Sequence, residues 1–163
     1  MRPRAATGFG RAVIAALLGL AISGADVHAQ TLSPDQMRAS AVIALDASKP
    51  GLALQVTEAL LLRDPDDVTA LILRARAARD LGQFDIAQPA AARAWSLSDT
   101  PQERFDSARV MAQVLSSEGK RTRAQLWLRR AVQHAPDDRA RQTAVREYRY
   151  VSARNRWNTQ LNF

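Results

Sequence analysis

Residues 119–136 read GKRTRAQLWLRRAVQHAP, and this stretch decides the fold of the 163-residue chain. Gly119 marks a break after one helix-length stretch, and Ala124 and Ala131 lie seven residues apart in the next one. Pro136 closes that second stretch. A glycine where one helix ends, small residues at a fixed spacing and a closing proline together predict a hairpin of two α-helices.

The same pattern occurs in residues 82–94, which read GQFDIAQPAAARA. The break at Gly82 is again followed by alanines after five and twelve positions. A third, more degenerate copy lies upstream, and successive copies are 34 and 37 residues apart. Repetition at this period is typical of stacked helical hairpins. The residues predicted to pack or bound the repeats are Ala41, Ala53, Ala75, Ala87, Ala94, Ala112, Ala124, Ala131, Gly82, Gly119, Pro65 and Pro136.

Alanine at these positions has a physical reason. The axes of packed helices lie about 8 to 10 Å apart, and the closest crossings need small side chains. Separate signals mark the helix starts: residues 33–36 (SPDQ) and 100–103 (TPQE) each predict an N-cap, a proline in the first turn and a capping-box partner. Residues 64–67 (DPDD) predict a similar start. Pro89 fits a helix only if that helix begins near residues 85–86.

Residues 35–136 resemble three tetratricopeptide repeats, and the segments 82–94 and 119–136 match the family pattern best. In the first unit, Ser48 stands where the family has glycine. The resemblance implies an all-α, TPR-like helical-hairpin solenoid of three helix pairs. A C-terminal capping helix is expected at residues 137–153, because the exposed end of such a stack needs a cover. The family resemblance also implies a module that binds another protein or a peptide segment and uses no cofactor.

Residues 1–29 have the order of a secretory signal peptide. Three arginines precede an apolar stretch at residues 12–22, and small residues end at Ala29, after which we expect cleavage. The apolar stretch has roughly half the length that a transmembrane helix needs. We therefore expect a periplasmic protein with a short N-terminal linker at residues 30–34. The chain has no cysteine, which excludes lipid attachment, disulfides and thiol catalysis.

The net charge of +7 is unevenly distributed along the chain. Residues 30–100 contain seven basic and nine acidic side chains, whereas residues 101–163 contain thirteen basic and six acidic ones. The basic excess of the exported protein is therefore C-terminal. Nucleic acid is not an expected partner of an exported chain, and we expect no small-molecule substrate.

Catalytic motifs are not evident in the sequence. His134 is the one histidine after the signal peptide, and its place at the end of a predicted helix fits a C-cap. The glycines after residue 29 fall in breaks between helices, so no phosphate-binding loop is expected. We therefore expect no enzyme and no metal site. A small periplasmic hydrolase is the alternative, and it would need an acid–base pair that the sequence does not display.

The first helix of each pair is expected to line the binding face of the stack. Arginines there suit an acidic segment or a terminal carboxylate through bidentate contacts, and a solvated helix face is the competing interpretation. The predicted partner-binding residues are Arg38, Arg74, Arg109 and Gln113. The arginine-rich C-terminal stretch fits either contact with anionic headgroups or the polar outer face of a capping helix. The residues predicted for this membrane-surface contact are Arg146, Arg149, Arg154, Arg156 and Trp157.

Residues 154–163 alternate polar and apolar side chains after Arg156, as a strand of a membrane barrel does. A signal peptide, short TPR-like repeats, an arginine-rich helix and an Arg-x-Trp strand opening resemble the N-terminal part of the surface lipoprotein assembly modifier family. This resemblance implies a periplasmic domain that recruits an exported lipoprotein at the outer membrane, as the front part of a longer protein. A frayed tail is the alternative interpretation of the same ten residues.

Overall fold

The computed structural model describes residues 32–155. All regular secondary structure in that range is α-helical. The predicted signal peptide and residues 156–163 of the alternating tail lie outside the described residues. The helices are α1 (Pro34–Asp46), α2 (Pro50–Arg63), α3 (Val68–Asp80), α4 (Phe84–Leu97), α5 (Pro101–Ser117), α6 (Arg121–Gln133) and α7 (Asp138–Ala153).

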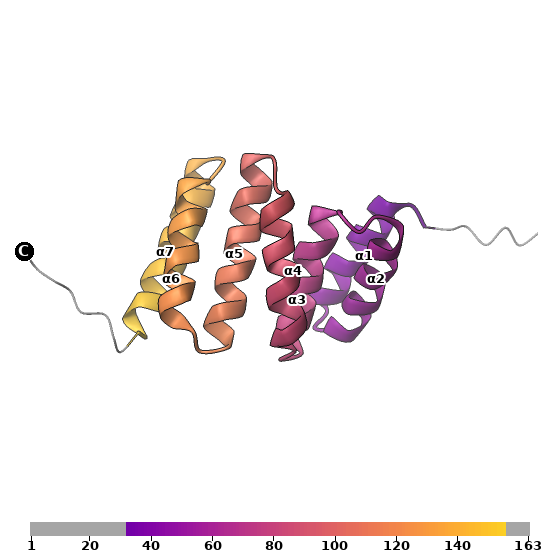
Figure 1. Ribbon diagram of the computed structural model, residues 1–163, viewed down its shortest axis with the longest axis horizontal. Helices are drawn as coiled ribbons and strands as arrows, with labels where there is room; N and C mark the ends of the chain where they lie inside the picture. The colour runs from indigo at the N-terminus through magenta and orange to yellow at the C-terminus, as the bar shows by residue number, and fades with distance from the viewer. Residues whose placement is uncertain (1–31, 156–163) are drawn as a thin grey trace, which may run out of the picture. The chain divides into compact units, whose positions relative to one another are not determined.

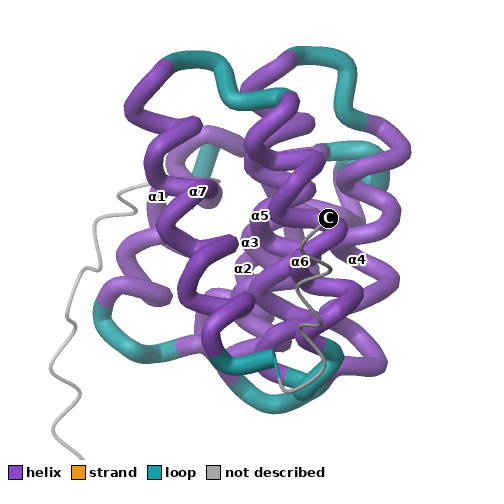
Figure 2. Tube along the Cα trace, turned by 90° about the vertical axis from the view of Figure 1, so that its left-hand side faces the viewer, coloured by secondary structure: helices purple, strands orange, loops and turns teal. Residues whose placement is uncertain are grey.

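These helices form a row of hairpins that runs from α1 to α7 (Figure 1). Each helix packs against the next one in the chain, and α3 also contacts α1 and α5. The odd-numbered helices therefore form one layer and the even-numbered helices the other; in Figure 2, α5 and α7 lie to the left of α4 and α6. The architecture of three helix pairs followed by a single closing helix confirms the predicted all-α helical-hairpin solenoid.

Alanines lie where helices of neighbouring hairpins meet. Ala78 of α3, Ala87 of α4 and Val114 of α5 form one buried cluster, which places Ala87 at a crossing of three helices. Larger side chains such as Leu115 and Leu128 fill the flanking space and are at most 2% exposed. The eight alanines of the repeat pattern, each at most 1% exposed, are Ala41, Ala53, Ala75, Ala87, Ala94, Ala112, Ala124 and Ala131.

Helix ends follow the predicted signals at four positions. Ser33 and Thr100 are N-caps of α1 and α5, and both form complete capping boxes. Gly82 and Gly119 follow the ends of α3 and α5 with φ of +73° and +87°, in the left-handed region that favours glycine. The N–H of Gln83 donates to the Ala78 carbonyl at 2.8 Å, the bond that closes a Schellman motif.

The predicted helix start at residues 64–67 is wrong by three residues. Asp67 is the N-cap of α3, and Pro65 lies exposed in the preceding turn. Asp64 begins that turn: its side chain accepts from the Asp66 N–H at 3.1 Å, and its carbonyl accepts from the Asp67 N–H at 3.3 Å. Proline is favoured in the second position of such a turn. Pro136 likewise lies exposed in the connection before α7, so neither proline packs between helices.

Pro89 lies deeper inside a helix than expected. α4 begins at Phe84, one residue before the predicted limit, and Pro89 is therefore its sixth residue. Without an N–H, Pro89 cannot donate to the carbonyl of Asp85 in the helical pattern.

Ser48 adopts the conformation for which the later repeats use glycine. Its φ is +56°, and the N–H of Lys49 donates to the Ala44 carbonyl at 2.8 Å, as in the other hairpin turns. The left-handed region costs an L-residue about 1–2 kcal/mol, although glycine loses more backbone entropy on folding. We expect Ser48→Gly to raise the free energy of unfolding by about 0.5–1 kcal/mol in urea denaturation.

Gly119→Ala is a control that makes the reverse change, because it adds a side chain at a helix end that already has glycine. A Cβ at Gly119 would have no heavy atom within 4 Å, so the measured loss would report backbone strain alone. A Ser48→Gly protein no more stable than the wild type would contradict the assignment of Ser48 to a strained helix end.

Candidate binding groove

The layer of odd-numbered helices carries a groove between α3 and α5. Its volume is about 580 Å³. Thr69, Ile72, Arg76 and Arg79 line it from α3 at spacings of three and four residues, which places them on one face of that helix. Opposite them, α5 contributes acidic and basic side chains, among them Asp106. The groove thus has a mixed, strongly charged lining.

A second groove, of about 460 Å³, lies between α5 and α7. Its lining is more apolar and includes Ala112, Leu128, Val151 and the ring of Tyr150. Tyr150 is 58% exposed, although the Arg154 guanidinium stacks on its ring. Such a lining suits an apolar side chain of a bound segment.

Arg79 and Gln113 line both grooves and join them. The Arg79 guanidinium donates to the Gln113 side-chain oxygen at 2.6 Å and pairs with Asp80 at 2.7 Å. The result is one surface that extends across α3, α5 and α7 and changes from charged to apolar along its length. Gln113, predicted from the sequence, therefore lies at the centre of the candidate site.

Arg109 contributes to the groove as part of an ion pair. Its guanidinium donates to both carboxylate oxygens of Glu147, at 3.1 and 2.7 Å, and stacks over the Phe105 ring at 5.5 Å. The side chains of Arg109 and Glu147 are 28% and 29% exposed. A bidentate pair of this kind fixes α7 against α5, so Arg109 holds the wall of the groove rather than offering a free cation.

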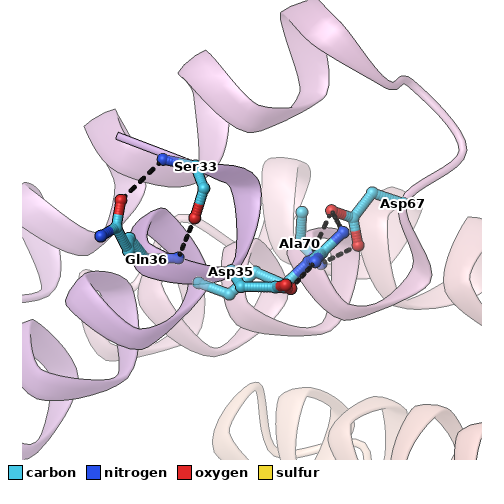
Figure 3. Close-up of polar contacts among 6 residues, drawn as sticks. Ser33, Asp35, Gln36, Asp67 and Ala70 are labelled. Atoms are coloured by element: carbon cyan, nitrogen blue, oxygen red, sulfur yellow. Dashed lines mark hydrogen bonds and ion pairs between the residues drawn. The ribbon is translucent and has the colours of Figure 1, made fainter. Parts of the chain in front are cut away.

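Arg38 is a structural residue. Its Nε and Nη2 atoms donate to Asp67 at 2.9 and 2.8 Å, and a second contact reaches Asp35. Asp67, whose side chain is 4% exposed, also accepts from the Ala70 N–H at 2.9 Å as the N-cap of α3 (Figure 3). The hydrogen bond that Arg38 donates to Asp67 is the main reason why the pKa of Arg38 is raised. The pair links α1 to the start of α3 and leaves Arg38 outside the two grooves.

Arg74 lies on a different face from the other predicted binding residues. It lines a separate groove of about 430 Å³, together with Leu61 of α2 and Pro89 of α4. Arg74 and Arg76 are two residues apart, so their side chains leave α3 about 200° apart. Of the two, Arg76 is the arginine on the odd-numbered face. Neither arginine side chain has a hydrogen bond or ion pair within residues 32–155.

The residues predicted for membrane contact do not form one cluster. Arg146 lines the apolar groove and donates to Thr143 at 2.9 Å, whereas Arg149 is exposed on α7. Arg154 stacks on Tyr150, with its guanidinium carbon 3.7 Å from the ring centre. The other two, Arg156 and Trp157, lie outside the described residues. None of the helices between residues 32 and 155 has the length and apolar character that a membrane span requires.

Two further titratable groups with shifted pKa values, Glu103 and Tyr148, take part in structural contacts. Backbone hydrogen bonds from Thr100 and Asp99 lower the pKa of Glu103, which completes a helix cap. A hydrogen bond from Arg129 lowers the pKa of Tyr148. His134 is the C-cap residue of α6, as predicted. Among residues 32–155 no group of three or more histidine, aspartate or glutamate residues is placed to hold a metal ion.

Sequence reasoning missed Arg76 and Glu147, which line the grooves. Arg76 follows Thr69 by seven residues and Ile72 by four, so all three residues lie on one face of the helix. This spacing would have selected Arg76 rather than Arg74 as the groove residue. No spacing in the sequence marks Glu147 as a groove residue in this way. Its partner Arg109 is 38 residues away in the sequence, and their pairing depends on how α7 packs against α5.

The comparisons with known proteins identify the fold only. No family model matches the chain, and no curated protein matches its sequence. Among solved structures, the type III secretion translocator chaperone SycD of Yersinia enterocolitica is similar, with a TM-score of 0.63 and 16% sequence identity. The match covers 78% of this chain and 90% of SycD. The fold is TPR-like. At this identity the likeness concerns the arrangement of the helices and leaves the surface lipoprotein assembly modifier resemblance as a prediction.

Proposed function

We propose that this chain is an exported, non-enzymatic adaptor that binds a segment of another protein along the odd-numbered face of its helical stack. The observation that carries the proposal is the pair of adjoining grooves, which share Arg79 and Gln113 and extend across three helices. Helical-repeat stacks use extended surfaces of this kind to bind partners. SycD, similar in fold, is described as a translocator chaperone, which supports a protein-binding role.

The lining specifies the chemistry of the bound segment. An apolar side chain fits between Leu128, Val151 and Tyr150, and a carboxylate fits beside Arg76, which has no acidic partner in the described part of the chain. The two sites lie in adjoining grooves, so one extended segment can occupy both. The partner is accordingly a protein segment that combines an apolar anchor with an acidic residue.

The periplasm is the location that we propose for this protein. The order of charges and apolar residues in the first 29 positions supports export to the periplasm, where an exported lipoprotein is a candidate partner. The exposed arginines Arg139, Arg141 and Arg149 on α7 support contact with an anionic outer-membrane surface.

Two arginines of α3 provide a matched test of the binding face. We expect Arg76→Glu to reduce capture of the partner from a periplasmic and outer-membrane extract by about tenfold, because it places a negative charge where the segment's carboxylate binds. Arg74→Glu makes the same charge change two residues away, on the other face, and we expect it to retain capture.

The measurement is quantitative mass spectrometry of proteins recovered on the immobilised wild-type chain and on each variant. Thermal melting of both variants verifies that they are folded. Equal capture by the two variants would contradict the assignment of the binding face, and a partner lost only with Arg74→Glu would place the site on the opposite layer.

A further inference from the structure

The first hairpin presents an apolar surface that no other part of residues 32–155 covers. Ile43 in the last turn of α1 is 67% exposed, and Leu52 in the first turn of α2 is 50% exposed. The two residues flank the same α1–α2 connection. Large exposed apolar residues that lie together typically mark an interaction site.

This surface faces away from the rest of the stack. Leu54 packs against the buried cluster of α3, α4 and α5, and Leu52 is two residues earlier on α2, about 200° around the helix. On α1, Ile43 lies two residues after Ala41 and is therefore also about 200° around the helix from it; Ala41 is fully buried. Ile43 and Leu52 therefore point outward from the N-terminal end of the row of hairpins.

Small residues accompany the two large ones at helical spacing. Ser40 and Ala47 lie three residues before and four residues after Ile43, and Ala59 lies seven residues after Leu52. We call these five residues the N-terminal end face. Small side chains between larger apolar ones are also found at the buried helix crossings inside the stack. The end face thus has the surface that a further pair of helices needs for packing.

The opposite end of the stack has a different surface. There α7 closes the row and exposes Arg139, Arg141 and Arg149. Terminal units of repeat proteins need such a polar outer face for solubility. The N-terminal end face lacks it, because its central residues are isoleucine and leucine.

From this surface we infer that two copies of the chain associate through their N-terminal end faces. A two-fold axis parallel to the helices places α1 of one copy against α2 of the other, antiparallel, and buries the end face on both copies. The Asp46 end of α1 then meets the Lys49 end of the partner's α2, and the two-fold axis repeats this contact in the other half of the interface. Both residues are exposed, and neither forms an ion pair within residues 32–155.

A second copy is the occupant that fits this arrangement. The charge pattern is self-complementary under the two-fold axis, as an interface between two copies of one chain requires. The inference goes beyond the proposed function, since the groove residues take no part in the contact.

Sedimentation equilibrium of the exported full chain tests the inference. We expect a monomer–dimer equilibrium in the wild type, and an increase of about tenfold or more in the dissociation constant for Ile43→Glu and for Leu52→Glu. Leu126→Glu is the matched control, because Leu126 on α6 is 54% exposed and lies outside the end face. We expect this control to dimerise like the wild type.

A charge exchange tests the orientation of the two copies. Asp46→Lys and Lys49→Asp should each weaken the dimer, and the double variant should restore it, because residue 46 of one copy faces residue 49 of the other. Unchanged thermal melting of the monomers excludes unfolding as the cause. A wild type that stays monomeric at all concentrations would overturn the inference, as would a dimer unaffected by Ile43→Glu and Leu52→Glu.

Discussion

Replacing Ala87 by arginine is expected to lower the free energy of unfolding by about 3–5 kcal/mol. Ala87 is fully buried where α3, α4 and α5 cross, against Ala78 and Val114. The space there holds a methyl group, so the longer side chain must displace helices or leave its charge buried without a partner. Urea denaturation followed by circular dichroism gives the change in stability.

Ala92→Arg is the matched control on the same helix. Ala92 is exposed on α4, and arginine is a good helix former, so this variant should differ from the wild type by less than about 0.5 kcal/mol. If Ala87→Arg and Ala92→Arg melted alike, the assignment of Ala87 to a close helix crossing would be wrong.

Removal of the Asp67 side chain is the second large expected effect. Asp67→Ala deprives α3 of its N-cap and leaves Arg38 without its buried carboxylate partner. The loss of a cap costs about 0.5–2 kcal/mol, and a hydrogen bond to a charged group contributes about 1.5–3 kcal/mol. We expect a total loss of about 2–5 kcal/mol in the free energy of unfolding.

Two further variants separate these contributions. Asp67→Asn keeps an oxygen that can accept from the Ala70 N–H but removes the charge, so it should lose less stability than Asp67→Ala. Asp66→Ala removes the adjacent acid, whose ion pair with Arg93 at 2.6 Å is largely exposed and worth at most about 1 kcal/mol. Equal losses for Asp66→Ala and Asp67→Ala would show that Asp67 has no special role.

The sequence was sufficient for the hairpins because their signals are local. Ser33 and Thr100 cap helices through residues three positions away, and Gly82 and Gly119 satisfy a backbone requirement at the end of a single helix. Ser48 shows that residue type alone does not predict every left-handed helix end. The first hairpin makes the same left-handed turn with serine, because the following helix must return along α1.

The candidate site was harder to predict because it depends on which faces meet. Arg38 and Arg109 lie on first helices of their pairs, as predicted, but both are engaged by acids 29 and 38 residues away. Arg74 was assigned to the binding face, whereas the packing of α2 and α4 places it in a different groove. Such pairings follow from the angle between helices in the assembled stack, which no single repeat specifies.

The most direct test of the proposed binding face is photo-crosslinking in intact cells. A photoreactive amino acid at residue 117 would sit at the exposed edge of the apolar groove, because Ser117 of α5 lines it. The same group at residue 126, exposed on α6 in the even-numbered layer, is the control. We predict a discrete crosslinked partner from residue 117 and none from residue 126. A partner crosslinked from residue 126 alone would contradict the account.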